Sequence, residues 1–357
     1  MTSRLPSHQA VRRPPLARRQ RGVAVITALL LTSLAITIVA SLFWQQQVQV
    51  RSMENQRLHL QTKWILRGAL DWAALVLRQD GQDHATYTAL EHVWATPLAE
   101  TRLDQYIERE RVEGEVFDAT LSGNIIDASS RYNLANLANA RAVSPDNVRI
   151  YAKLLRNLSL DPGLAARTAK FVAESQPVAG EGQLQQGEML TGGTGTTSTG
   201  TGGSPPAGLP RLGASSGSTP MALTDVNDLL AIPGYTLAIV DRLREFVIVL
   251  PEANPVNVNT ASAEVLAAVI ADYSVGEASA LVERRKRASW RDEANFATQL
   301  FETTGKKPEN GATDVKSKYF LVRSRIRLDR AALNAEALVY REPGLRHITS
   351  VLWVRQN

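Results

Sequence analysis

The chain has 357 residues, no cysteine and a formal net charge of +5. The absence of cysteine excludes disulfide bonds, thiolate nucleophiles and cysteine-ligated metals. The positive charge does not indicate an anionic ligand. Residues 1–22 contain six arginines and no acid, and six charges taken from +5 leave −1 for the remainder. The basic balance therefore marks membrane orientation.

An apolar segment follows the basic one directly. Residues 23–44 carry no charge, and the next charged residue is Arg51. At about 1.5 Å per residue, a helix of this length crosses a hydrocarbon core of about 30 Å. The arginines keep the N-terminus in the cytoplasm, so the bulk of the chain is expected on the other side of the membrane. A plain signal anchor and a cleavable secretory signal are the alternatives.

The junction of these segments resembles a processing site. Residues 19–31, RQRGVAVITALLL, are similar to the leader of type IV prepilins. The resemblance implies that a prepilin peptidase cuts after Gly22 and methylates the amine of Val23. The fifth mature residue of such proteins is usually Glu, but here it is Thr27. Thr27 cannot pair with a neighbour's N-terminal amine, which favours a place at a filament tip; the simpler interpretation is that Thr27 tolerates lipid.

One long helix is predicted after the leader. No Pro or Gly occurs between Val23 and Arg67, so the helix can continue to about Gln79, with Gly81 as its C-cap. An apolar stripe at helical spacing predicts the face that packs on a sheet: Leu58, Ile65, Ala69, Trp72 and Val76. A membrane helix followed by a separate soluble helix is the alternative.

The remaining chain predicts strands, then helices, then strands. Residues 112–121 and 124–133 are predicted as strands joined by a hairpin at Ser122–Gly123. Helices are expected at 144–158, 164–173, 225–231, 236–246, 262–270 and 277–287. Final strands are expected at 319–329, 335–341 and 348–354, with one face of the first formed by Phe320, Val322, Ser324, Ile326 and Leu328. Residues 178–220 are rich in Gly, Ser, Thr and Pro and predict a flexible loop.

Four segments together resemble the K class of minor pseudopilins of type II secretion systems. They are the leader with Thr27, IIDASSRYNLANL at 125–137, NPVNVNTASAEVLAA at 254–268 and SKYFLVRSRIRL at 317–328. The resemblance implies a tip complex with I- and J-class minor pseudopilins on a pseudopilus, which takes part in export of folded proteins across the outer membrane. It also implies that the span lies in a bacterial inner membrane and that the bulk of the chain is periplasmic. A type IV minor pilin is the alternative within this class.

The predicted fold is α+β, with a pilin-like long N-terminal helix packed on an antiparallel sheet and a single N-terminal transmembrane helix. A large all-α domain, SAM-like or helix-hairpin-helix-like, is inserted between the strands. The predicted divisions are a leader at 1–22, a transmembrane part at 23–44, a first pseudopilin part at 45–135, the helical domain at 136–312, and C-terminal strands at 313–357.

No cofactor is predicted. Some relatives bind calcium in the helical domain, but the comparable stretch here is KFVAES at 170–175. Calcium takes six to eight oxygen ligands, and the acids near this stretch are few: Glu174, Glu181, Glu188, Asp225 and Asp228.

The sequence contains no motif of a hydrolase, P-loop enzyme or dinucleotide enzyme, so a structural subunit is predicted rather than an enzyme. His84 and His92 could form a zinc site with Asp80, Asp83 and Glu91, but they are interpreted as surface-loop residues, and no metal site is predicted. Strand-end and turn roles are expected for Asp127, Arg131, Tyr132 and Asn133, and cap or left-handed positions for Asn133 and Asn136.

Two helical hairpins raise the alternative of a membrane-anchored DNA-uptake receptor. Such hairpins usually carry two glycines, whereas these carry one each, Gly234 and Gly276. The basic run at 283–287 is interpreted as a solvated helix face. No nucleic acid is therefore expected; the expected partners are I- and J-class minor pseudopilins, the pseudopilus, prepilin peptidase and inner-membrane lipid.

The leader makes a first testable prediction. Mass spectrometry of the protein purified from membranes should show an N-terminus at Val23, with the added mass of one methyl group. An intact chain that still begins at Met1 would contradict processing at Gly22.

Overall fold

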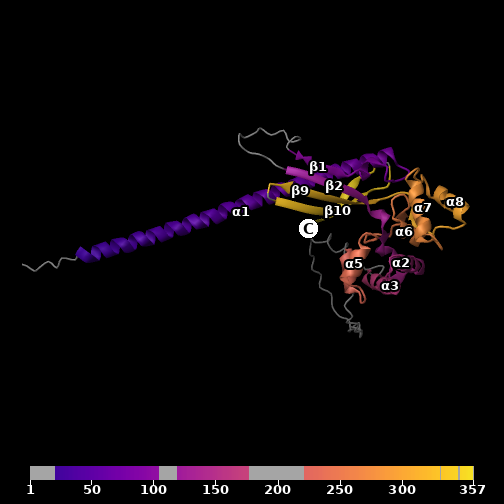
Figure 1. Ribbon diagram of the computed structural model, residues 1–357, viewed down its shortest axis with the longest axis horizontal. Helices are drawn as coiled ribbons and strands as arrows, with labels where there is room; N and C mark the ends of the chain where they lie inside the picture. Colours follow the sequence, from indigo (N-terminus) through magenta and orange to yellow (C-terminus); the bar gives the residue numbers. More distant parts are fainter. Residues whose placement is uncertain (1–20, 104–118, 177–220, 330, 345, 357) are drawn as a thin grey trace, which may run out of the picture. The chain divides into compact units, whose positions relative to one another are not determined.

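The computed structural model describes residues 21–103, 119–176, 221–329, 331–344 and 346–356 (Figure 1). The chain divides into a unit at 1–61 and a compact unit at 62–357. One uninterrupted helix, α1 (Arg21–Asp83), supplies the described residues of the first unit and opens the second. The prediction of a single long helix is confirmed.

The C-cap predicted at Gly81 is wrong. Gly81 lies inside the last turn of α1 and is buried. A Cβ atom at this position would lie 2.8 Å from Cγ of His347, so the glycine allows the histidine ring to approach the helix. A glycine near the end of a helix can mark a C-cap, but Gly81 instead permits close packing.

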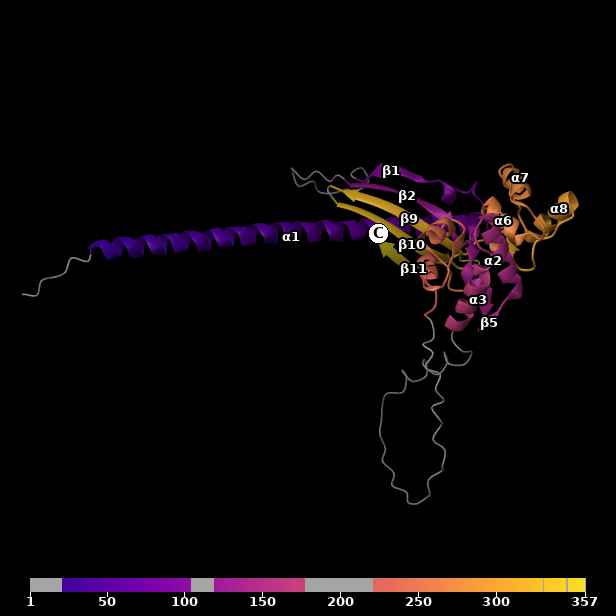
Figure 2. The same ribbon diagram turned by 60° about the horizontal axis from the view of Figure 1, so that its bottom comes forward.

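A five-stranded antiparallel sheet, in the order β1-β2-β9-β10-β11, is one layer of the second unit (Figure 2). Its strands are β1 (Leu98–Arg102), β2 (Ala119–Asp127), β9 (Tyr319–Leu328), β10 (Ala331–Arg341) and β11 (Thr349–Gln356). The predicted C-terminal strands and antiparallel sheet are confirmed. The five residues predicted to share a face of β9 are all buried.

The hairpin predicted at Ser122–Gly123 is wrong. These residues lie within β2, which pairs with β9 along its whole length, and Gly123 lies opposite Ser324. A Cβ atom on Gly123 would overlap the backbone oxygen of Arg323. The glycine therefore permits a close contact between strands and makes no turn. Residues 112–118 of the predicted first strand lie outside the described part of the chain.

The part of α1 within the second unit covers one face of this sheet. Its buried apolar side chains pack with those of the central strands: Leu66, Leu70, Ala73 and Leu77 against Phe320, Val322, Ile326, Ala335, Ala337 and Val339. The predicted stripe is confirmed in part. Ala69 is buried, and Ile65 and Val76 are partly buried against the same cluster. Trp72 is 51% exposed, because apolar residues occur on several sides of this helix.

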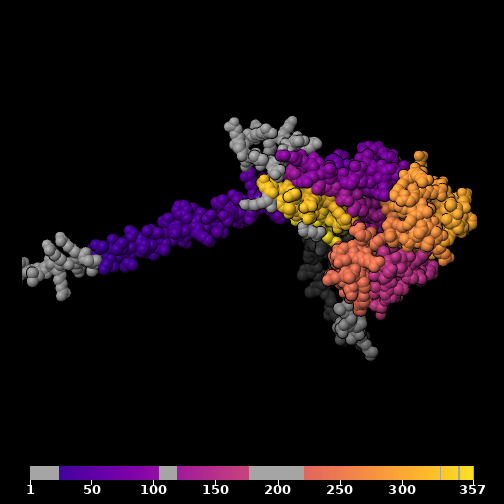
Figure 3. All heavy atoms as spheres, viewed as in Figure 1, coloured from indigo at the N-terminus to yellow at the C-terminus, as the bar shows by residue number. Residues whose placement is uncertain are grey.

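Between β2 and β9 the chain forms a set of short helices, which gather beside one end of the strands (Figure 2). The atoms of this part of the chain, coloured magenta to orange, lie together in the space-filling view (Figure 3). They are α2 (Pro145–Asn157), α3 (Leu164–Ser175), α5 (Leu237–Leu243), α6 (Ala263–Val269), α7 (Val275–Arg285) and α8 (Glu293–Thr304). Residues Val226–Ala231 form a 3₁₀ helix, and the other predicted helices are confirmed as α-helices. Helix α8 was not predicted, although Asp292 caps its start and Gly305, at φ +70°, ends it.

The helices enclose the largest cluster of buried apolar side chains in the described residues. At its centre the rings of Tyr132 and Tyr151 stack with centroids 5.6 Å apart. The hydroxyl of Tyr235 lies within hydrogen-bond distance of Tyr151 (2.9 Å) and Thr168 (2.8 Å). These contacts satisfy the hydroxyls of Tyr151 and Tyr235, and the Tyr132 hydroxyl donates to the carbonyl oxygen of Asn147 at 3.0 Å. The predicted loop at 178–220 lies outside the described residues.

Replacing Gly123 by Ala tests the contact between β2 and β9. The added methyl group must displace the backbone of Arg323, and we expect a loss of about 1–3 kcal/mol in the free energy of unfolding, as for other overpacked sites. Gly68→Ala is the control, because a Cβ atom added at Gly68, in α1, would meet no heavy atom within 4 Å. It should gain about 0.5–1 kcal/mol. Equal thermal stability of the two variants would contradict the close contact.

Candidate functional site

The N-terminal half of α1 has the composition of a membrane span. It contains a window with a mean hydropathy of 2.4, the one candidate span among the described helices. Every described side chain from Ala24 to Arg57 is exposed. Of the predicted processing residues, Gly22 and Val23 lie in the first turn of α1, and residues 1–20 of the leader lie outside the described part of the chain.

The hydroxyl groups in this helix bond to the helix itself. Thr27 Oγ1 donates to the carbonyl oxygen of Ala24 at 3.0 Å, and Thr37 Oγ1 donates to that of Ser33 at 2.8 Å. Such bonds make a hydroxyl compatible with hydrocarbon, where water is absent. Thr27 therefore suits lipid, and its meaning for filament position stays a prediction.

In the second unit, the three segments that carry the family resemblance meet at one buried carboxylate. Asp127, the last residue of β2, accepts three hydrogen bonds at Oδ2. The donors are Asn257 Nδ2 at 3.0 Å, Thr260 Oγ1 at 2.5 Å and Ser317 Oγ at 2.6 Å. Oδ1 accepts a fourth from the backbone N–H of Ser129 at 2.8 Å. Residues far apart in sequence are thus held to one side chain.

Two opposing effects act on the Asp127 carboxyl. Burial raises its pKa, and the hydrogen bonds from Ser317, Thr260, Ser129 and Asn257 lower it without cancelling the effect of burial. The folded chain therefore holds this proton to a higher pH than the unfolded chain does. The contribution of Asp127 to stability is complete below its unfolded pKa and is lost as the pH rises through the folded one.

The predicted strand-end residues extend this junction. Asn133 Oδ1 accepts from the N–H groups of Ala135 (3.1 Å) and Leu250 (3.0 Å), so it caps a 3₁₀ helix as predicted, at φ −83° and not in the left-handed region. Asn136 exchanges two hydrogen bonds of 2.9 Å with the backbone of Asn254.

Arg341, which sequence reasoning missed, joins the sheet to the end of α1. Its guanidinium donates to Asp80 Oδ2 at 2.8 Å, Thr88 Oγ1 at 2.9 Å and the Ser317 carbonyl at 3.2 Å. It also lies 4.7 Å from the centroid of the Phe320 ring. A charged last residue in an apolar strand was the only sequence signal for this role.

The structure brings His84 and His92 to the same carboxylate. Nδ1 of His92 lies 2.8 Å, and Nδ1 of His84 3.2 Å, from Asp80 Oδ1. His92 is 3% exposed, so its interpretation as a surface-loop residue is wrong. Asp83 instead accepts from Gln79, and Glu91 accepts from Ser289.

The acids considered for calcium have other partners where they are described. Glu174 lies 3.8 Å from Lys170, Asp225 caps the 3₁₀ helix and pairs with Arg355, and Asp228 accepts from Thr224. Glu181 and Glu188 lie outside the described residues.

The basic run in α7 is partly internal. Arg285 is buried and donates to the carbonyl oxygens of Val258 and Ala261. Its neighbour Lys286 lies 2.6 Å from Glu283. The interpretation of this run as a solvated helix face therefore holds only in part. Fewer of its charges are available to a phosphate than its composition indicates. Of the hairpin glycines, Gly234 has φ +103°, and Gly276 lies in the first turn of α7.

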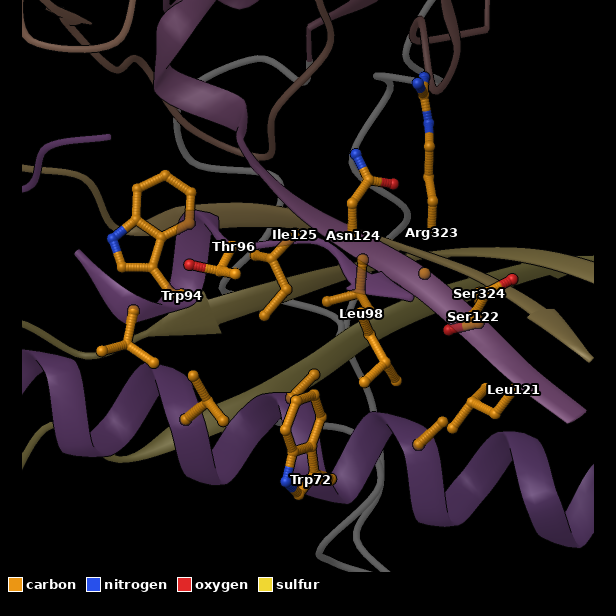
Figure 4. A pocket seen from close by; sticks show the side chains of 16 residues that line it. Trp72, Trp94, Thr96, Leu98, Leu121, Ser122, Asn124, Ile125, Arg323 and Ser324 are labelled. Atoms are coloured by element: carbon orange, nitrogen blue, oxygen red, sulfur yellow. The ribbon is translucent and has the colours of Figure 1, made fainter. Parts of the chain in front are cut away.

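A small apolar pocket of about 70 Å³ lies between α1 and β2 (Figure 4). Trp72 lines it from α1, and Leu98, Leu121 and Ile125 line it from the strands. Trp72 and Val93 are 51% and 76% exposed, so apolar surface continues outside the pocket. The arrangement offers mainly apolar contact area.

A long apolar helix whose end packs on an antiparallel sheet defines a membrane-anchored, pilin-like subunit. Two models of the family "Type II secretion system (T2SS), protein K" match residues 130–252 and 256–316. The type II secretion system protein K of Pseudomonas aeruginosa is 31% identical over 324 residues, which cover 88% of this chain and 86% of that protein. The corresponding protein of Klebsiella pneumoniae is 27% identical, with 79% and 80% covered.

A solved structure has the same fold. It is the crystal structure of the GspK-GspI-GspJ complex from enterotoxigenic Escherichia coli, with a TM-score of 0.60, 19% identity, and coverage of 85% of this chain and 99% of that one. The chain belongs to the type II secretion system protein K family and is a minor pseudopilin of that system. The family resemblance found in the sequence is confirmed.

Removal of the Asp127 carboxylate tests the buried junction. Asp127→Ala leaves four donors without their acceptor, and we expect it to lower the free energy of unfolding by about 3–5 kcal/mol, as when one partner is removed from a buried charged network. Asp241→Ala is the control, because Asp241 forms an exposed pair with Arg244. It should cost less than about 1 kcal/mol. Similar denaturant midpoints for both variants would contradict the role of Asp127.

Proposed function

We propose that this chain occupies the tip of a short periplasmic pseudopilus, in a complex with I- and J-class minor pseudopilins, and takes part there in the export of folded proteins across the outer membrane. Membership of the K family carries this proposal, and the structurally similar chain was crystallised as a GspK-GspI-GspJ complex. The helical insertion supports a single terminal copy, because so large a group of helices beside the sheet would obstruct a repeating filament.

The membrane arrangement is part of the same proposal. Residues 23–44 would lie in the inner membrane after cleavage at Gly22, with the N-terminus cytoplasmic and the remaining chain periplasmic. Six arginines on one side of an uncharged span support this orientation. Thr27, in place of a carboxylate, supports a terminal position because it offers no charge to a subunit above it.

The role we propose is structural, without a catalytic or calcium-binding function. Asp127, the most deeply buried acid among the described residues, is fully occupied by donors, and Asp225 and Asp228 are engaged in capping the 3₁₀ helix. We also assign the helices from α2 to α8 to a SAM-like or helix-hairpin-helix-like domain. The paired α6 and α7, joined by a short turn, support that assignment.

The exposed apolar residues near the end of α1 are the partner surface that we propose. Trp64, Trp72 and Leu75 are 69%, 51% and 58% exposed, and Val93 adjoins them at the pocket. Apolar surface of this kind, beside a helix already packed on its other side, marks an interaction site on a soluble domain. The occupant we assign is an I- or J-class minor pseudopilin.

Replacement of Trp72 by Glu tests this surface. With both partners co-expressed, we expect the wild-type full chain to co-purify with I- and J-class minor pseudopilins and Trp72→Glu to lose at least tenfold in yield of the complex. Phe301→Glu is the matched control, since Phe301 on α8 is 50% exposed, and it should retain the partners.

Circular dichroism of each variant will separate loss of binding from loss of folding. Equal recovery of partners by folded Trp72→Glu would exclude this surface. Failure of the wild-type chain to recover either partner would contradict the tip complex itself.

A further inference from the structure

We propose that Asp80, His84 and His92 bind a divalent transition-metal ion, for which zinc is the best-fitting choice. One ligand atom from each residue lies within 4.8 Å of the others, the one such group of three found in the described residues. Two imidazoles and a carboxylate are a donor set that zinc and its neighbours prefer over calcium or magnesium.

The separations between the histidine nitrogens and the Asp80 oxygen are close to those between ligands of one ion. With bonds of about 2.0–2.1 Å, two ligands of a tetrahedral zinc ion lie about 3.3 Å apart. Nδ1 of His92 and Nδ1 of His84 lie 2.8 Å and 3.2 Å from Asp80 Oδ1. The two rings stack with centroids 3.9 Å apart at 22°. A rotation of the half-exposed His84 ring would bring both lone pairs onto an ion beside Oδ1.

His92 carries the second, independent observation. Its ring is buried, and neither nitrogen makes a hydrogen bond of acceptable geometry in the described structure, although Nδ1 lies 2.8 Å from Asp80 Oδ1. Among the described buried side chains, only the indole nitrogen of Trp94 shares this condition. A neutral imidazole has one lone pair and one N–H, and burial of unpaired polar groups is costly. A metal ion beside Oδ1 of Asp80 would give the buried ring a partner of suitable geometry.

The surroundings hold the carboxylate in the orientation that an ion requires. Arg341 binds Oδ2 of Asp80 at 2.8 Å and leaves Oδ1 directed at the histidines. Arg341 is itself fixed by Thr88 and by the carbonyl of Leu77. Outer groups that orient a ligand in this manner are typical of protein metal sites.

The ion would connect two separate segments. Asp80 lies in the last turn of α1, and His92 directly precedes the 3₁₀ helix Val93–Ala95 that leads to β1. His84 is 38% exposed, so a remaining coordination position faces solvent. A structural ion at the end of α1 would contradict the sequence-based prediction of no metal site. The proposal does not depend on the proposed tip partners.

Zinc binding by the full-length protein in detergent is the test, with an affinity tag that contains no histidine. After treatment with a chelator, the protein is titrated with Zn²⁺ in competition with a chromophoric ligand. His84→Ala removes a half-exposed ligand, and His59→Ala, an exposed histidine elsewhere on α1, is the matched control. We expect one equivalent of Zn²⁺ to bind to the wild type and to His59→Ala, with at least tenfold weaker binding by His84→Ala.

Two further readouts keep the proposal testable if His84→Ala folds poorly. Zn²⁺ should raise the melting temperature of the wild type and His59→Ala, and Co²⁺ in the wild type should give the visible absorption of a low-coordinate site. Absence of Zn²⁺ binding by the wild type, equal affinity in folded His84→Ala, or a Co²⁺ spectrum like that of the hydrated ion would each overturn the site.

Discussion

The buried carboxylate of Asp127 is the constraint on which the second unit depends. A chain without cysteine cannot join distant segments covalently, and this carboxylate joins three of them by hydrogen bonds. Each donor replaces a water molecule that the carboxylate loses on burial, so the bonds are required for the charge or proton to be tolerated there. Arg341 also joins distant segments, because it donates hydrogen bonds to Asp80 at the end of α1 and to Ser317, which precedes β9.

The two halves of the continuous helix α1 carry side chains suited to two different environments, lipid and a protein core. Its first half has apolar side chains on every side and hydroxyls bonded to its own carbonyls, as a lipid-exposed helix requires. Its second half buries Leu66, Leu70 and Leu77 against the sheet and turns Trp72 outward. The change in side-chain pattern along a continuous helix couples a membrane anchor to a folded domain without a linker.

The sequence predicted what local chemistry determines and missed what packing determines. Capping serines and the alternation of β9 located most helices and the C-terminal strands correctly. The stripe predicted on α1 wrongly included Trp72, which is exposed, since several faces of the helix are apolar. Gly123 was assigned to a turn because a glycine that allows strands to approach and a glycine that makes a turn look alike in sequence. The meeting of Asp80, His84 and His92 depends on the path of the chain after α1, which no local pattern reports.

The position of Asp127 explains how a large helical insertion coexists with a regular sheet. The insertion leaves the sheet after Asp127 and returns at Tyr319, and Asp127 lies opposite Phe320 in the register of β2 and β9. Closing so long an excursion costs chain entropy that rises only with the logarithm of its length. The bond from Ser317 to Asp127 fixes its two ends together, and those from Asn257 and Thr260 fix its interior to the same point. The helices are thereby held against the strand ends as part of one unit.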